Sequence, residues 1–162
     1  MQKQTKKKEI CLILHNIRSS HNVGSIFRTA DGVGAQKIYL SGYTPAPTDK
    51  FGRINKELSK VALGAEEEID WEKIEDIFSL VKKLREKNFL IIALEQDEKA
   101  EDYKKIKLEK NIAVILGSEV EGVPKEILLH CDAVAEIPMF GKKESLNVSV
   151  ATGIFLYELV SR

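Results

Sequence analysis

Five short runs of apolar and β-branched residues constrain the fold of this chain more than any other feature. Each run is nearly continuous rather than alternating, which is typical of strands covered on both faces. Stretches with helical patterns separate the runs, and this alternation predicts an α/β fold with a mainly parallel sheet and helices on both faces. The predicted strands are Ile10–Leu14, Lys37–Leu40, Phe89–Leu94, Ile112–Leu116 and Ala133–Ile137.

The residues between these runs predict helices from their caps and apolar stripes. Val23–Val33 follows Asn22, a residue type preferred as an N-cap. The segment Ser41–Lys50 is rich in turn-forming residues and predicts an exposed loop. The other predicted helices are Arg53–Leu63 ending near Gly64, Glu72–Lys87 with one apolar stripe, Pro124–His130, and Leu146–Val160 with Ser145 as its N-cap.

Length and composition indicate one cytoplasmic domain spanning residues 1–162, with residues 1–8 as a basic, flexible tail. No apolar run approaches the ~20 residues that cross a bilayer, and the N-terminus lacks the apolar segment of a signal peptide. The two cysteines, Cys11 and Cys131, are too few for a disulfide framework or a zinc site. They are predicted to be buried, reduced thiols, and no metal site is expected.

Charge is unevenly distributed although the net charge is zero. Residues 1–60 hold 11 Lys and Arg against 4 Asp and Glu, whereas residues 61–162 hold 14 against 21. Such asymmetry can create one basic face that attracts phosphate. The alternative is that Lys6, Lys7 and Lys8 form only a solvated tail.

The first segment that carries candidate functional residues runs from residue 16 to residue 30. It places Arg28 on an otherwise apolar or small helix, six residues after Asn22. A salt-bridged or snorkelling arginine is the structural alternative to a functional one. The nearby Gly32–Gly34 follows a predicted helix rather than a strand, so a dinucleotide-binding loop is rejected.

The second segment, residues 115–124, begins where a predicted buried strand ends. Gly117 and Gly122 permit close backbone approach, and ligands of open α/β sheets bind at the carboxyl ends of strands. Glu119 and Glu121 make this loop a poor phosphate cradle and favour a cationic ligand, such as a sulfonium that carries an α-amino group. The alternative is that both carboxylates only cap a helix N-terminus.

The third segment, residues 136–151, leads from a strand into the last helix. Asn147 stands early in this helix, although asparagine disfavours helix interiors. The helix is apolar on more than one side, which predicts that a second subunit buries part of it.

Together the three segments resemble the SpoU (TrmH) family of RNA methyltransferases in the SPOUT superfamily. Order and spacing agree, and the resemblance covers about residues 9–162. The family pattern N-x-G-x-x-x-R-T-A is matched by Asn22, Gly24 and Arg28–Ala30. The pattern L-G-S-E-x-x-G is matched by Leu116–Glu119 and Gly122, and I-P-M-x-G-x-x-x-S-L-N-V-S-V-A by Ile137–Met139, Gly141 and Ser145–Ala151.

The resemblance implies a deep C-terminal trefoil knot and a homodimer in which the first motif of one subunit meets the cofactor site of the other. It implies that S-adenosyl-L-methionine (AdoMet) is the cofactor and that tRNA or rRNA is the partner, with tRNA favoured because compact relatives often act there. The implied cofactor contacts are Leu94, Gly117, Ile137, Met139, Leu146 and Asn147. RNA contacts are expected from Lys6, Lys7, Lys8, Arg18 and Arg53.

The implied reaction is attack of a ribose 2'-oxygen on the AdoMet methyl group. The family points to Arg28 as the base, but a guanidinium stays protonated, so Arg28 is predicted to position the hydroxyl and stabilise the alkoxide. Asn22 and Asn147 would orient these groups, Glu119 would pair with Arg28 or with a partner-subunit residue, and Ser145 would shape the methionine end of the cofactor site. Two alternatives are a non-catalytic RNA-binding module with the same fold and methylation of a base.

Overall fold

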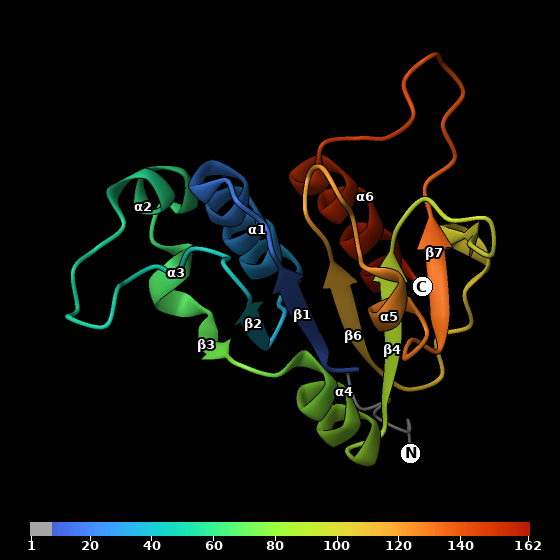
Figure 1. Ribbon diagram of the computed structural model, residues 1–162, viewed down its shortest axis with the longest axis horizontal. Helices are drawn as coiled ribbons and strands as arrows, with labels where there is room; N and C mark the ends of the chain where they lie inside the picture. Colours follow the sequence, from blue (N-terminus) through green and yellow to red (C-terminus); the bar gives the residue numbers. More distant parts are fainter. Residues whose placement is uncertain (1–7) are drawn as a thin grey trace, which may run out of the picture.

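Seven strands form one sheet in the computed structural model, which describes residues 8–162 (Figure 1). Their order is β3-β2-β1-β6-β4-β7-β5, and every neighbouring pair is parallel. The predicted α/β class with a mainly parallel sheet is confirmed, while the knot stays a prediction. The strands are β1 (Ile10–His15), β2 (Lys37–Ser41), β3 (Asp70–Ile74), β4 (Phe89–Leu94), β5 (Glu101–Asp102), β6 (Asn111–Leu116) and β7 (Ala133–Glu136).

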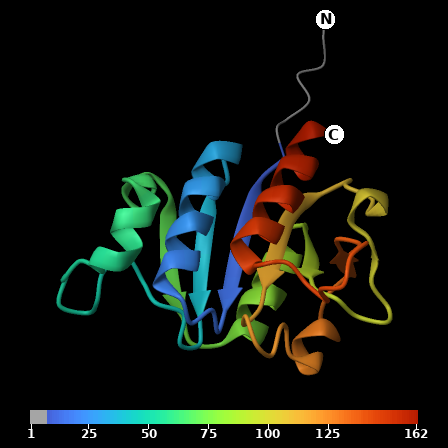
Figure 2. The same cartoon turned by 90° about the horizontal axis from the view of Figure 1, so that it is seen from above.

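Helices cover both faces of the sheet because the central strands bury both of their faces. In β1, Leu12 belongs to the core beneath α1 and α6, whereas its neighbour Ile13 belongs to the core beneath α4. Figure 1 and Figure 2 show α1 and α6 side by side across the sheet. The first face carries α1 (Ser20–Val33), α2 (Lys56–Ala62), α3 (Ala65–Glu68) and α6 (Val148–Ser161), and the second carries α4 (Ile77–Glu86) and α5 (Lys125–Leu128).

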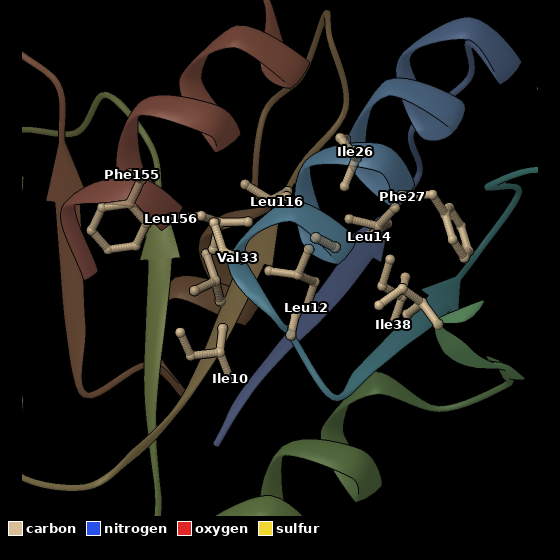
Figure 3. Close-up of a cluster of buried hydrophobic side chains, with 14 of the residues drawn as sticks. Ile10, Leu12, Leu14, Ile26, Phe27, Val33, Ile38, Leu116, Phe155 and Leu156 are labelled. Carbon is tan, nitrogen blue, oxygen red and sulfur yellow. The ribbon is translucent and has the colours of Figure 1, made fainter. Parts of the chain in front are cut away.

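The larger core lies between α1, α6 and the middle of the sheet. Figure 3 shows Phe27 of α1 and Phe155 of α6 among the aliphatic side chains of the central strands. Both rings are fully buried. Because burying such a side chain stabilises a fold by about 1.5–3 kcal/mol, these two rings anchor both motif-bearing helices on the sheet.

The predicted helix Glu72–Lys87 is wrong in its first part. Residues 70–74 form the edge strand β3, which pairs with β2, and α4 begins at Ile77 after the N-cap Asp76. Pairing with a neighbouring strand overrides the local helical pattern here. Strand β5 was also missed, because its two acidic residues carry no apolar signal.

Two predicted N-caps are also wrong. The cap of α1 is Ser19, whose Oγ accepts a hydrogen bond from the Asn22 N–H (3.1 Å), so Asn22 lies in the first turn. The cap of α6 is Asn147 rather than Ser145, and its Oδ1 accepts from the Ser149 N–H (2.9 Å). Asparagine therefore has a structural role at position 147 that the sequence interpretation overlooked.

Other boundaries shift by a few residues. Helix α2 ends at Ala62, and its C-cap Leu63 adopts the left-handed conformation (φ 54°), while Gly64 is the N-cap of α3. Pro124 is the N-cap of α5 rather than its first residue. The segment 41–50 is not fully exposed, because Thr44 is buried and its Oγ1 accepts from the Ile17 N–H (3.1 Å).

Both cysteines are free thiols, as predicted. Cys11 is buried and Cys131 is half-buried. Burial raises the pKa of Cys11 to about 12 and that of Cys131 to about 11, so both thiols stay protonated near neutral pH. No helix within residues 8–162 is long and apolar enough to cross a membrane.

Candidate functional site

The second and third motif segments line one cavity beside the carboxyl ends of β4 and β6, and the first lies next to it. The cavity holds about 260 Å³, which is several times the ~30 Å³ share of one water and leaves room for an organic ligand. Its walls come from residues 94–96, 116–122 and 145–148, together with Ile137 and Ala151. Of the predicted site residues, those that line it are Leu94, Gly117, Glu119, Ile137, Ser145, Leu146 and Asn147, whereas Met139, Asn22 and Arg28 do not.

Glycine is required at two points of the loop that forms one wall of this cavity. A Cβ atom on Gly117 would lie 2.3 Å from the carbonyl carbon of Gly122. Gly122 itself has φ 67°, and a Cβ there would lie 2.2 Å from Oε2 of Glu95. The wall is therefore built by close contact between backbone segments, which larger residues would prevent.

Glu95 holds this wall in place. Its Oε2 accepts a hydrogen bond from the Val123 N–H (2.7 Å), and its Oε1 accepts from the Gln96 N–H (2.8 Å). The sequence interpretation missed Glu95, although its position directly after the buried strand β4 was a usable signal.

Glu119 ties the same loop to the start of α1. Its carboxylate accepts hydrogen bonds from the N–H groups of Arg18 (3.1 Å) and Ser19 (3.2 Å) and from Nδ2 of Asn22 (3.1 Å). Burial raises the pKa of Glu119, but hydrogen bonds from its own N–H and from these three donors outweigh it, and the net pKa is lowered. Glu119 is therefore ionised at neutral pH and lies at the N-terminus of α1, where an anion is favourable.

A chain of polar contacts joins all three motif segments. Asn22, which is almost fully buried, receives a hydrogen bond at Oδ1 from Nδ2 of Asn147 (3.2 Å) and donates to Glu119. Glu119, Asn22 and Asn147 were predicted as site residues from separate parts of the sequence, and the structure places Asn22 in contact with the other two.

Arg28 lies apart from this polar chain. It is exposed on α1, about two turns beyond Asn22, and within residues 8–162 it forms no ion pair or side-chain hydrogen bond. Of the two predicted partners of Glu119, Arg28 of the same chain is not in contact with it, because the carboxylate of Glu119 binds the start of α1. Pairing of Glu119 with a residue of a partner subunit stays a prediction.

The predicted RNA contacts are spread over the molecule. Lys6 and Lys7 lie outside the described residues, and Lys8 donates a hydrogen bond to the Leu108 carbonyl. Arg18 is exposed next to the cavity wall, and Arg53 is exposed in the loop between β2 and α2. In the part of the chain that the structure describes, no three His, Cys, Asp or Glu side chains gather to hold a metal ion.

Known proteins resemble the chain over nearly its whole length. Residues 9–157 match the model of the SpoU rRNA Methylase family. A curated relative, the 23S rRNA (guanosine-2'-O-)-methyltransferase RlmB of Pectobacterium atrosepticum, is 35% identical over 149 residues, which is 92% of this chain. The chain spans only 58% of the length of that relative.

Solved structures show the same similarity. An AdoMet-bound rRNA methyltransferase from Sinorhizobium meliloti superposes with a TM-score of 0.85 at 29% identity, covering 95% of this chain and 56% of that one. The A. aeolicus TrmH/SpoU tRNA modifying enzyme superposes with a TM-score of 0.83 at 29% identity, covering 96% of this chain and 76% of that one.

Proposed function

This chain belongs to the SpoU rRNA Methylase family, and on that premise we propose that it transfers a methyl group from AdoMet to a ribose 2'-hydroxyl of RNA. One observation carries the proposal: Asn22 is hydrogen-bonded to both Glu119 and Asn147, so that residues of three family motifs are linked beside a cavity. This arrangement beside an open cavity favours a reaction site over a non-catalytic module.

The residues around the cavity fit AdoMet. The ligand combines an apolar adenine ring with a positively charged sulfonium and an α-amino group. Aliphatic side chains for the ring come from Leu94, Ile137 and Leu146, while Glu119 and Glu121 supply negative charge. When bound, AdoMet supplies an activated methyl group on sulfur. The protein then has to hold it, exclude water and present the ribose.

The position of Arg28 supports catalysis across a homodimer. It is exposed on α1 outside its own cavity, and the neighbouring α6 exposes Val150, Ile154 and Tyr157 on its outer surface. Burial of that apolar strip by a second copy would bring the α1 of one subunit toward the cavity of its partner. We infer that Arg28 there orients the 2'-hydroxyl and stabilises the alkoxide as the methyl group is transferred.

The relatives suggest which RNA to test first. The RlmB relative is named for a guanosine ribose of 23S rRNA, and the A. aeolicus neighbour is described as a tRNA modifying enzyme. We propose rRNA as the first substrate to test and tRNA as the second, with the reaction taking place in the cytoplasm where both RNAs are found.

The direct test incubates the purified protein with tritiated-methyl AdoMet and with total RNA from a deletion strain. Nuclease digestion and mass spectrometry then identify the modified nucleoside. A 2'-O-methyl nucleoside is expected. Detection of a methylated base would overturn the proposal that the ribose is modified. If AdoMet caused no thermal shift and no methyl group were transferred, the chain would be a non-catalytic module.

Replacement of Asn147 by alanine is expected to weaken AdoMet binding about tenfold, because the cap of α6 and the contact with Asn22 are both lost beside the cavity. Loss of an N-cap costs about 1 kcal/mol, so the melting temperature should also fall by about 2–4 °C. Calorimetry and thermal unfolding measure the two effects.

Asn55→Ala is the matched control. Asn55 caps α2 through the Leu58 N–H (3.1 Å) and donates to Ser20 on α1 (3.0 Å), but it does not line the cavity. It should lower the melting temperature to a similar extent and leave AdoMet affinity unchanged. Equal AdoMet affinity in both variants would remove Asn147 from the cofactor site.

A further inference from the structure

Two exposed aromatic side chains lie next to cations, one beside Arg18 and the other in the loop between β2 and α2. Tyr43 is 52% exposed and Phe51 is 70% exposed. The guanidinium carbon of Arg18 is 5.9 Å from the centre of the Tyr43 ring. Both Lys50 Nζ and the guanidinium carbon of Arg53 are 5.1 Å from the centre of the Phe51 ring. These five residues are called the aromatic strip below.

The outer end of the aromatic strip is a well-defined turn. Oδ1 of Asp49 accepts hydrogen bonds from the N–H groups of Phe51 (2.8 Å) and Arg53 (3.0 Å), and its Oδ2 accepts from Nε of Arg53 (2.7 Å). These hydrogen bonds with Arg53 and Phe51 lower the pKa of Asp49, so the carboxylate that organises the turn stays ionised at neutral pH. In Figure 1 and Figure 2 the loop between β2 and α2 projects at the left edge of the molecule. Phe51 is therefore held in solvent by folded backbone rather than by a loose segment.

The inner end of the aromatic strip reaches the cavity wall. The Arg18 N–H donates to Glu119, which lines the cavity. The Tyr43 N–H donates to Oδ1 of Asn16 (3.2 Å), two residues before Arg18. Tyr43 therefore lies beside the segment that contacts the cavity wall, and Phe51 follows it in the loop between β2 and α2.

We propose that the aromatic strip binds an unpaired stretch of the RNA substrate. Bases would stack on Tyr43 and Phe51, and phosphates would pair with Arg18, Lys50 and Arg53. Stacking on aromatic rings is available only to bases that are not enclosed in a duplex, and the cation beside each ring can pair with the phosphates of the same strand. A cation accompanies each ring, which suits the negatively charged backbone of an RNA strand.

This inference rests on the proposed function, and it makes that function more specific. The methylated ribose would lie in or beside a loop, bulge or single-stranded end rather than inside a continuous helix. Sequence preference would then come from residues other than the aromatic strip, because every base has a face that can stack.

The binding test uses a fluorescein-labelled 12-nucleotide RNA without secondary structure, and a duplex of the same length, at fixed salt. Fluorescence anisotropy of the full chain should show affinity for the unpaired RNA falling about tenfold for Tyr43→Ala and about tenfold for Phe51→Ala. Tyr43→Phe and Phe51→Tyr keep the ring and should bind like wild type. The control Phe78→Ala removes a partly exposed ring on α4, on the other face of the sheet, and should change nothing.

A spectroscopic test reports stacking directly. Trp71 is the only tryptophan of the chain, so the variant Phe51→Trp adds one new emitter at the tip of the turn. Unpaired RNA should quench this added fluorescence and leave the Trp71 signal of the wild type almost unchanged. A purely structural role for position 51 would produce no such difference.

Methyl transfer by the wild type is measured in parallel, so that the two proposals fail separately. If the wild type transfers methyl groups, but Tyr43→Ala and Phe51→Ala leave RNA affinity and the KM for RNA unchanged, only the proposal that the aromatic strip binds RNA would be overturned. RNA binding that depends on both rings without any methyl transfer would overturn the proposed function alone. If Tyr43→Ala and Phe51→Ala weakened binding of the duplex as much as binding of the unpaired RNA, the proposed preference for unpaired bases would be overturned.

Discussion

Substitution of Arg28 by alanine is expected to lower methyl transfer about 100- to 1000-fold and to leave AdoMet affinity within about threefold of wild type. The size of this loss follows from the role proposed for Arg28, which is to place a positive group next to the developing alkoxide. AdoMet affinity should change little because Arg28 is exposed on α1 and does not line the cavity of its own subunit. Calorimetry with AdoMet and single-turnover transfer from tritiated-methyl AdoMet separate binding from chemistry.

Two controls make this result specific to the guanidinium group. Arg28→Lys keeps the charge but loses the planar set of donors, so it should retain only part of the rate. Lys82→Ala removes an exposed cation from α4, on the other face of the sheet, and should leave transfer unchanged. Near wild-type turnover by Arg28→Ala would remove this residue from the mechanism.

Mixed dimers test whether Arg28 acts in the neighbouring subunit. An Arg28→Ala chain keeps an intact cavity, and a chain with a defective cavity keeps an intact Arg28. After unfolding and refolding an equal mixture of the two, about a quarter of the sites would combine both intact parts, because half of the dimers are mixed and each has one complete site. Recovery of about that fraction of wild-type activity is expected, and no recovery would place Arg28 in its own subunit's reaction.

The part of the fold that the sequence predicted well is the part that is buried on both faces. Strands such as β4 and β6 are continuous apolar runs because helices cover both sides, and their predicted limits lie within one residue of the observed ones. The edge strand β3 has mostly exposed residues, and only its pairing with β2 makes it a strand. Its local pattern could not reveal that tertiary contact.

The same distinction applies to the candidate site. Glycines and polar residues at the ends of buried strands predicted the place of the cavity, because parallel strands end at one edge of a sheet. Hydrogen bonds between distant segments were beyond the sequence. Nothing in the spacing of Glu119 and Arg28 showed that the carboxylate would bind the start of α1 instead, and Glu95 was identified only through its contact with Val123.

Substitution of Gly117 by alanine is expected to weaken AdoMet binding about 10- to 100-fold, which is the size expected for a forced overlap costing about 1–3 kcal/mol. The added Cβ would lie 2.3 Å from the carbonyl carbon of Gly122 and 2.4 Å from the Val123 nitrogen, both of them backbone atoms. That backbone cannot retreat freely, because the Val123 N–H is bound by Glu95 at 2.7 Å. The cavity wall must therefore shift, and calorimetry with AdoMet measures the resulting loss of AdoMet affinity.

Gly32→Ala is the matched control, because it makes the same chemical change on α1. Its added Cβ would meet the hydroxyl oxygen of Tyr157 at 2.9 Å, which is the far end of a side chain rather than backbone. Alanine also has the higher helix propensity, so this variant should bind AdoMet like wild type and unfold at an equal or higher temperature. If Gly117→Ala kept wild-type AdoMet affinity while its melting temperature fell, the wall would have moved without affecting the ligand. The cofactor would then have to bind somewhere other than the cavity between residues 94–96, 116–122 and 145–148.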